Sequence, residues 1–524
     1  MIRHQRMSTS AWKPAGMALV ALLFAGGPAW AGQAGPRAPA APAGAAPAAQ
    51  GPTLALSMDE AVAMALETSL GLKSQRLTVD IAAQNVAGAR AAFLPQVSSN
   101  ITRTTAESPG IVFEDGTVAA SSSSSVVGGA SFLQPLRWFG GSVSANWQAN
   151  RNATSGTNST FNPRLGSSFR VNFSQPLWRD FRIDGARAGL QTSERQSVIV
   201  DMQLQQRVVA TEVAVRSAYL GLVAAIQGQS VAQQNMDLAE QSLRNANARV
   251  AVGQSPQIDI VTAQASVEGF RESLIVATAR IDTAEDNLRA QILDPARPDY
   301  WTVRLQPTDE IQLAPREIDV DAAIKNALAN RLDMAVAKRS MEITDLNLAV
   351  ARNNTRPAVD LDVGYSARGD GGTEFFNGTT RIRGFGTVLS DAFGGAFPSW
   401  STGVTVSYPL GHSSAEAALA RSQLQKQQEV LDLRQLELAI VADVRQAARE
   451  VRTSFERVRA TEAALTATQS QLEAEERKFA VGLSDTFQLQ QRQRDLASAR
   501  TNRLGAIISY STALIQFDRV QKIP

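Results

Sequence analysis

Few side chains in this chain could carry out chemistry of their own. None of its 524 residues is a cysteine and two are histidines, of which only His412 lies beyond the first 31 residues. A thiolate nucleophile is therefore excluded, and a Ser/His/Asp triad or an imidazole metal site would depend on that one histidine. His412 falls at the predicted junction between a strand and a long helix, where a solvated position near the helix cap is ordinary. The sequence predicts no enzymatic activity, no cofactor and no metal.

The residues that stand out instead lie at two predicted tight turns between long helices. A glycine just past a helix end permits the left-handed backbone that such turns need. Backbone geometry does not explain Leu483, an apolar side chain at an exposed apex, and such a residue suits contact with a partner. In the first turn, Ser255 is predicted to cap the returning helix. The candidate tip residues are Arg249, Gly253, Gln254 and Ser255 in the first turn, and Arg477, Gly482, Leu483 and Ser484 in the second.

Long helices must hold these turns. The stretch 412–481 contains neither glycine nor proline, and it opens with a capping box at Ser413 and Glu416. Its apolar residues recur at helical spacing, and at ~1.5 Å per residue it would be on the order of 100 Å long. A helix of that length needs neighbours of similar length. Further helices are predicted over 57–93, 183–252, 257–292 and 485–517.

The chain consists of two copies of one unit. Residues 58–97 recur 262 positions later with twelve identities in forty positions, and a second match runs at an offset of 229, as at Val215 and Val444. The change in offset gives the first copy about 33 extra residues. A Gln-Pro-Leu sequence occurs at both 134–136 and 175–177. The extra residues are therefore predicted to form an added hairpin, which either lengthens an external loop or adds strands.

Between the helices of each copy lies a segment rich in Gly, Ser, Thr and Asn with alternating polarity. Segments of about ten residues, apolar on one face and polar on the other, are typical of a membrane β-barrel wall. The alternative is a soluble sandwich, or hairpins packed on the helices. Two strands in the second copy cannot close a barrel, so a barrel would be shared between chains. Strands are predicted at 96–105, 127–135, 142–150, 167–175, 358–368 and 401–408, with external loops at 154–163 and 369–398.

The N-terminus resembles a secretory leader, with an N-terminal anchor as the alternative. Three basic residues precede a short apolar run, and removing Arg3, Arg6 and Lys13 changes the formal charge from +2 to about −1. That balance does not suit nucleic-acid binding. No other run approaches ~18 apolar residues, so no membrane-spanning helix is expected. The predicted divisions are a signal peptide (1–31), a disordered Ala/Pro linker (32–53), a first repeat (54–293, strands about 96–176), an inter-repeat segment (294–319), a second repeat (320–518, strands about 358–409) and a C-terminal tail (519–524).

Taken together, the chain resembles the TolC-like outer-membrane factors. The stretch from Arg477 to Ser484 is similar to the RxxxxGL(S/T) tip motif of that family, and the duplicated order of helix, strands, long helix, turn and return helix is similar throughout. The resemblance implies a mainly α fold with membrane β: a trimeric outer-membrane β-barrel of 12 strands shared between chains, continued by a long periplasmic α-helical barrel. It places the protein in the outer membrane of a Gram-negative bacterium, extending into the periplasm.

The resemblance also implies a function. Such a protein is the exit duct of a tripartite efflux pump or type I secretion system, and it conducts substrate passively once a periplasmic adaptor docks at the tips and the helices untwist. Its partners would be two further copies of itself, the adaptor, an inner-membrane pump and lipid, but not nucleic acid. The family often carries acidic gate residues near the second tip, where this chain has Gln488 and Gln491, with Asp259 at the matching place in the first copy. The alternatives are a periplasmic structural coiled coil without a pore and a periplasmic enzyme or binding module.

Overall fold

The computed structural model describes residues 52–112, 118–155, 160–309, 311, 313–376, 379–410 and 413–521. The predicted signal peptide, all but the last two residues of the predicted linker, His412 and the last three residues of the predicted tail lie outside these ranges.

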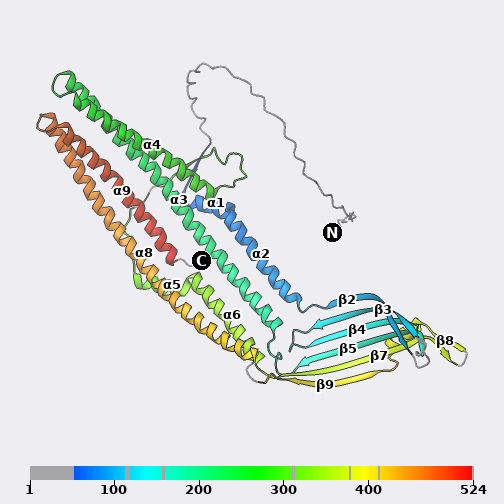
Figure 1. The fold of residues 1–524 in the computed structure, drawn as a ribbon. Coiled ribbons are helices and arrows are strands. Elements are labelled where there is room, and N and C mark those ends of the chain that lie inside the picture. The colour runs from blue at the N-terminus through cyan, green and yellow to red at the C-terminus, as the bar shows by residue number, and fades with distance from the viewer. Residues whose placement is uncertain are drawn as a thin grey trace, which may run out of the picture. The chain divides into compact units, whose positions relative to one another are not determined.

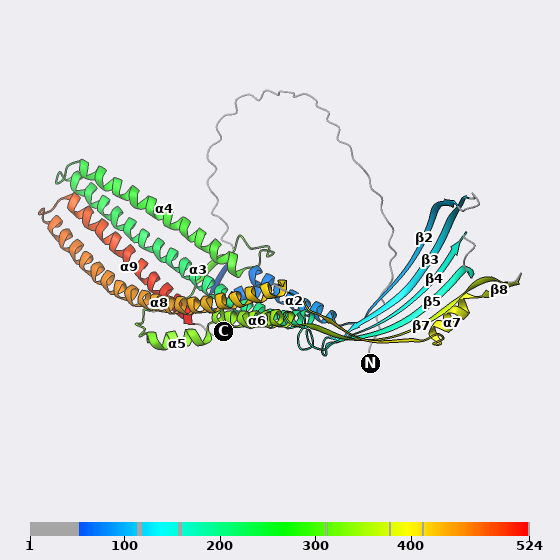
Figure 2. The same ribbon diagram turned by 60° about the horizontal axis from the view of Figure 1, so that its bottom comes forward.

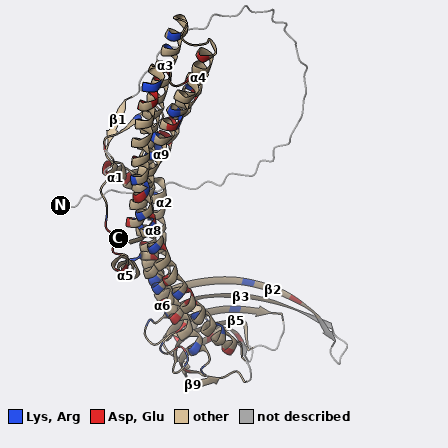
Figure 3. Ribbon diagram, turned by 90° about the vertical axis from the view of Figure 1, so that its left-hand side faces the viewer, with Lys and Arg blue, Asp and Glu red and all other residues tan. Residues whose placement is uncertain are grey.

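Two antiparallel pairs of long helices lie side by side: α3 with α4, and α8 with α9 (Figure 1). α3 and α8 have 67 residues each. The predicted capping box begins α8, where the Ser413 hydroxyl accepts from the Glu416 amide at 3.2 Å. Both charge signs are interspersed along the helices (Figure 3), as solvated faces require. The helices are α1 Met58–Thr68, α2 Leu70–Ala91, α3 Gly185–Ala251, α4 Ile258–Ile292, α5 Val320–Asn330, α6 Leu332–Asn354, α7 Phe385–Phe393, α8 Ser414–Ala480 and α9 Thr486–Gln521.

The helical region predicted over 57–93 is present, but it is divided into two helices. Ser69 takes a non-helical ψ of 118° and separates α1 from α2, and its hydroxyl accepts from the Leu72 amide to begin the second helix. Arg331, 262 positions later, takes a ψ of 133° and separates α5 from α6 in the same way. In each copy one residue with a non-helical backbone redirects the chain. Neither Ser69 nor Arg331 is a glycine or proline, so residue type alone does not predict the break between the helices.

The two largest apolar clusters of the helical part each centre on one pair of long helices. In one, Val215 and Tyr219 of α3 pack with α1 and α4; in the other, Val444 of α8 packs with Tyr510 of α9 and with α5. Each tyrosine is buried and satisfies its hydroxyl on a backbone carbonyl, that of Leu56 at 3.1 Å for Tyr219 and that of Ala314 at 2.7 Å for Tyr510. By length and composition alone, α3 has a stretch apolar enough to span a membrane, contrary to expectation. Of that stretch, 28% is buried, so core packing accounts for only part of its apolar character.

The strands lie at the opposite end of the long helices from the tight turns (Figures 1 and 2). They form one antiparallel sheet in the order β2-β3-β4-β5-β7, and β8 and β9 pair with successive parts of the free edge of β7. A separate parallel ladder joins β1 Thr53–Leu56 to β6 Arg304–Pro307, and only β6 belongs to the inter-repeat segment. The sheet strands are β2 Gln96–Val112, β3 Val118–Pro135, β4 Ser142–Thr154, β5 Phe161–Pro176, β7 Ala358–Phe376, β8 Thr379–Arg383 and β9 Ser399–Ser407.

The sheet has one apolar and one polar face. Residues directly opposite each other on paired strands share a face, and neighbouring rows alternate between faces. One row crosses the sheet through Val97, Phe132, Ala145, Val171, Tyr365 and Trp400. The adjacent row runs through Ser98, Ser131, Asn146, Arg170, Ser366 and Ser399. The alternation predicted from sequence therefore continues in register from one edge strand to the other.

Where the structure describes them, the two predicted external loops are largely regular structure. β4 and β5 extend into 154–163, and 369–398 contains the end of β7, then β8 and α7. The glycines of β7 in the second of these segments allow α7 to pack closely on the strand. A Cβ on Gly371 would lie 2.6 Å from Val388 Cγ2 of α7. Phe393 at the end of α7 packs on Phe169, with 5.2 Å between ring centroids. Here the glycine-rich composition reflects a helix seated on the apolar sheet face, where a larger side chain would push it away.

Candidate docking and gating site at the helical tips

The two hairpin tips share one backbone geometry. Gly253 and Gly482 have φ values of 73° and 77°, which strain any residue with a side chain. In each tip the amide after the glycine donates to the carbonyl five residues earlier, at 2.8 Å in the first and 2.9 Å in the second. This is the longer bond of a Schellman helix end. A Cβ added to either glycine would meet nothing within 4 Å, so backbone conformation alone requires glycine here.

The second tip is held by two side-chain hydrogen bonds and exposes an apolar apex. Asp485 caps α9 by accepting from the Gln488 amide at 2.8 Å. The Ser484 hydroxyl donates to the carboxylate of Glu475, and this bond lowers the pKa of Glu475. Leu483 is 78% exposed. The tip is therefore a fixed turn that presents a hydrophobic side chain to solvent.

The first tip begins its return helix later than expected. Ser255 was predicted as N-cap, but α4 starts at Ile258, with Gln257 at the cap position and no side-chain capping bond. A residue before proline is pushed towards an extended conformation, so Pro256 delays the helix. The first bond of the turn runs from the Asp259 amide to the Pro256 carbonyl at 3.1 Å.

Arg249 joins the two tips. Its guanidinium donates to the Phe479 carbonyl at 3.0 Å and lies over the Phe479 ring, 4.0 Å from the centroid. The side chain predicted to meet an adaptor is thus engaged within the protein, whereas Arg477 and Leu483 of the second tip are exposed. The sequence contains no local signal for this contact, because the partners are 230 residues apart.

Two further polar contacts tie α3 to α9 above the tips. Gln493 donates to the Ser242 hydroxyl, and Arg500 donates to the Asn235 amide oxygen at 3.0 Å. Asn235 is only 7% exposed, and burial lowers the pKa of Arg500. The sequence analysis did not identify these residues. A polar side chain at a predicted buried position between two helices would have indicated them, because buried polar groups need a hydrogen-bond partner.

The predicted gate residues occupy two different helices. Gln488 is exposed on α9, Gln491 is half-buried one turn on, and Asp259 lies in the first turn of α4. Among the residues that the structure describes, no hydrogen bond joins Asp259 to either amide. Gln491 instead donates to Asp495 at 3.0 Å, and Arg492 pairs with the same carboxylate at 3.2 Å. An acidic residue is therefore present one turn beyond the predicted positions, bonded to the amide.

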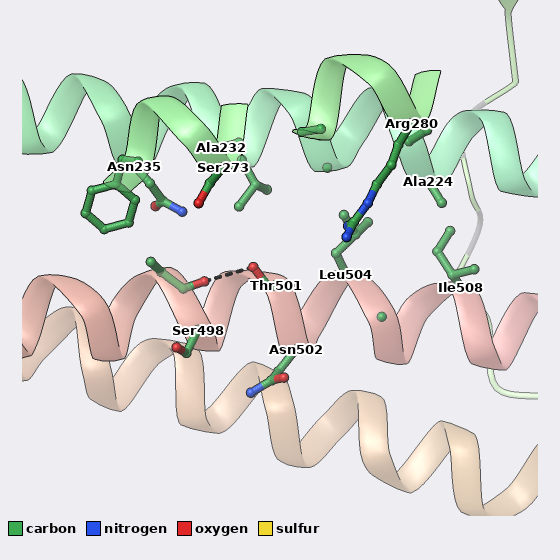
Figure 4. Close-up of a pocket in the computed structure, with 17 residues that line it drawn as sticks. Ala224, Ala232, Asn235, Ser273, Arg280, Ser498, Thr501, Asn502, Leu504 and Ile508 are labelled. Carbon is green, nitrogen blue, oxygen red and sulfur yellow. Dashed lines mark hydrogen bonds between the residues drawn. The ribbon is translucent and has the colours of Figure 1, made fainter. Parts of the chain in front are cut away.

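An open groove of about 590 Å³ lies between α3, α4 and α9 (Figure 4). Its lining is mostly apolar or small, and Arg280 is its only ionisable member. The Arg280 side chain runs from α4 towards α9, and Thr501 donates to the Ala497 carbonyl within α9 at 3.0 Å (Figure 4). In the described part of the chain, no group of three His, Cys, Asp or Glu side chains could hold a metal ion. The groove separates two helical pairs and lacks an acid-base pair for catalysis.

Comparison with known proteins agrees with this architecture. The model of the outer membrane efflux protein family matches residues 138–292 and 323–520. The chain is 23% identical to the outer membrane protein TolC of Vibrio cholerae over 347 residues, 66% of this chain and 74% of that protein. It is 25% identical to TolC of Escherichia coli over 356 residues, 65% of this chain and 67% of that protein. A crystal structure of CusC, from work on its folding and transmembrane channel formation, has a TM-score of 0.65 at 14% identity, with 89% of this chain and 92% of that chain covered.

The family match covers most of both sequence copies, including both long helices and both tips. The largely helical fold with one large antiparallel sheet is that of the outer-membrane efflux channels. The resemblance inferred from the tip motif and the duplication is therefore confirmed, and so is the outer membrane of a Gram-negative bacterium as the location. This is a family of channels and not of enzymes. The chain belongs to the outer membrane efflux protein family.

Proposed function

We propose that the protein is the outer-membrane exit duct of a tripartite efflux pump or type I secretion system. The observation that carries the proposal is the two-faced sheet at one end of helices 67 residues long. An apolar face suits lipid and a polar face suits a water-filled lumen. The helices would continue that lumen into the periplasm. Conduction would be passive, because nothing in the described groove or tips provides for energy conversion.

The sheet supports a barrel shared among three chains. Its edges, β2 on one side and β8 with β9 on the other, have no partner strand within the described chain. Lipid offers no water to satisfy unpaired backbone groups, so membrane strands must close on themselves. Pairing β2 of one copy with β9 of the next would close the sheet. The same arrangement would bring the helical pairs of three copies around one periplasmic tunnel.

The tips support docking and gating. Leu483 and Arg477 are the exposed residues of the second tip, and we assign them to an adaptor surface together with Gly482 and Ser484. In the first tip Gly253, Gln254 and Ser255 would take the matching place. The contacts of Arg249, Ser242 and Asn235 across the seam would hold the tunnel closed until docking separates the two helical pairs. Asp259, Gln488 and Gln491 would line the narrowed end.

We propose the same segments of the chain that the sequence predicts. Residues 1–31 would direct export and 32–53 would act as a linker, 54–293 and 320–518 would be the two repeats, 294–319 would join them, and 519–524 would be the tail. Pairing of β6, within 294–319, with β1 at the start of the first repeat gives the joining segment a defined place beside α1 and α3.

Purification of the mature protein from outer membranes in detergent tests the proposal. Light scattering and negative-stain imaging should show an elongated trimer on the order of 140 Å long, from ~1.5 Å per helical residue and ~3.3 Å per strand residue. A monomer that stays soluble without detergent would overturn the barrel and the transport function together. That outcome would favour a periplasmic coiled coil without a pore.

A further inference from the structure

The first copy contains two successive hairpins of similar sequence. Residues 93–100 and 139–146 share Phe, Val, Ser and Asn at the same four positions. The strands that follow each end in the same pattern, a Phe two residues before Gln-Pro-Leu, at 132–136 and at 173–177. The hairpin β2–β3 and the hairpin β4–β5 are therefore two versions of one unit.

The duplicated residues make the same contacts. Gln134 donates its side-chain amide to the Phe93 carbonyl at 2.7 Å and to the Pro135 carbonyl at 2.8 Å. Gln175 donates to the Phe139 carbonyl at 2.7 Å and to the Pro176 carbonyl at 2.9 Å. Since Phe93 and Phe139 occupy matching positions, each glutamine ties the end of its hairpin to the beginning of the same hairpin. The likeness is one of local structure as well as of sequence.

Both hairpins belong to the sheet, and neither lies outside it as a loop. β3 and β4 pair without a register shift from Pro135 opposite Ser142 to Ser123 opposite Thr154. The turn between them is fixed at the helical end, where the Phe139 ring stacks on that of Phe181 just before α3, 4.8 Å between centroids. The apolar and polar rows described above continue across this junction. The added residues thus add strands.

The second copy contributes fewer crossing strands. β7 and β9 both start at the helical end, and β9 pairs with Ala358–Ser366 of β7, whereas β8 pairs only with the last part of β7, Gly372–Phe376. At nine residues, β9 is long enough to cross a bilayer as a tilted strand. Each chain therefore supplies six crossing strands, β2, β3, β4, β5, β7 and β9. The 12-stranded barrel expected from the resemblance needs only four strands from each of three chains.

We infer that the duplicated hairpin widens the membrane pore, so that three chains close an 18-stranded barrel. The inference rests on the proposed trimer. Barrel diameter rises roughly linearly with strand number, so 18 strands give a barrel about 1.5 times as wide as 12. The polar face of the two hairpins carries mostly uncharged side chains, such as Ser131, Asn146 and Gln148, together with Arg164 and Arg170 on β5. Such a lining suits a wide aqueous exit for bulky hydrophilic cargo, since it offers mostly hydroxyl and amide groups, with positive charge at the arginines of β5.

Two matched deletions test the inference. One removes Leu94–Phe139 and joins Phe93 to Gly140; the other removes Arg137–Leu177 and joins Leu136 to Trp178. They delete different hairpins but leave the same number of strands, so a sequence-specific effect would appear in only one of them. Electron cryomicroscopy of trimers in detergent should count 18 strands in the unaltered protein and 12 in each variant. In planar bilayers, the largest poly(ethylene glycol) that enters from the extracellular side should fall to about two-thirds of its diameter.

The outcomes separate the inference from the proposed function. A trimeric duct with a 12-stranded barrel and one hairpin folded outside it would overturn the inference and leave the duct intact. A protein that forms no membrane trimer would overturn both. If both deletion variants fail to fold, the strand count of the unaltered trimer decides the matter alone.

Discussion

The guanidinium of Arg249, at the end of α3, lies over the ring of Phe479 near the end of α8, and it donates to the Phe479 carbonyl at 3.0 Å. This single side chain connects the tips of the two helical pairs. A cation over an aromatic face contributes about 0.5–2 kcal/mol, depending on how far it is desolvated. A charge-assisted hydrogen bond adds a comparable amount. The contact is strong enough to bias the tips towards one arrangement and weak enough to be broken by a docking partner.

Replacing Arg249 with alanine should open the tunnel without an adaptor. Losing on the order of 1–2 kcal/mol from the closed state would raise the open population about 5- to 30-fold. Single-channel recordings of the purified protein should show higher conductance or longer openings. Arg477→Ala is the matched control, because Arg477 is exposed on the other tip and its side chain does not bridge the tips. Equal conductance in the two variants would show that the Arg249 contact does not restrain the gate.

The exposed apex of the second tip should be needed for export. Leu483→Glu places a charge where an apolar contact is proposed, and Gly482→Pro is incompatible with the φ of 77°. Both should lower efflux in cells, measured as increased drug sensitivity, while trimers still form. Gln254→Glu is the comparison, since Gln254 holds the same turn position in the first tip and shows how much that tip contributes to docking. Unchanged sensitivity with both second-tip variants would contradict the docking assignment.

Much of the fold follows from sequence because its signals are local. The long helix α8 lacks glycine and proline and opens with a capping box, and the predicted His412–Val481 differs from the observed Ser414–Ala480 by one or two residues. The family and the tip turns follow from the duplication and from Gly482 with its neighbours. What sequence missed are features set by tertiary packing. Ser69 separates two helices although it is neither a glycine nor a proline. Gly371 was predicted to lie in a loop, whereas it lies in β7 and leaves room for α7 to pack against the sheet.

The gate is the least predictable part for the same reason. Gln491 was identified by its place after the tip, but its partner Asp495 is recognised only once both side chains are positioned on α9. The Asn235–Arg500 contact joins residues 265 apart along the chain, between helices whose relative rotation no local pattern determines. Identifying such pairs requires the packing of the two copies against each other.

The second tip should weaken in acid through Glu475. The Ser484 hydroxyl lowers the pKa of that carboxyl below its ordinary 4.5. A depressed pKa in the folded state contributes stability that is present above the unfolded pKa and is lost as pH falls through the folded one. The difference in thermal stability between the unaltered protein and Ser484→Ala should therefore be present at pH 7 and shrink below about pH 4.5.

Glu475→Gln provides the control for the pH experiment. An amide oxygen can still accept from Ser484 but does not titrate in this range. Adding Ser484→Ala to the Glu475→Gln protein should therefore change its thermal stability by the same amount at pH 7 and at pH 3. If the unaltered protein and Glu475→Gln respond to acid in the same way, another group is responsible for the loss.

The alternation of the sheet predicts opposite effects for neighbouring residues of β9. Val404 lies opposite Leu361 and Thr405 opposite Asp360, so the two side chains point to the apolar and the polar face respectively. A lysine on a lipid-facing strand position costs about 2–4 kcal/mol near the bilayer midplane, whereas a lysine in the lumen remains in water. Val404→Lys should therefore reduce the amount of folded protein in the outer membrane and lower its unfolding midpoint in urea, while Thr405→Lys should leave both nearly unchanged. The reverse order would mean that the apolar face is turned away from lipid, and equal tolerance of both lysines would mean that β9 lies outside the membrane.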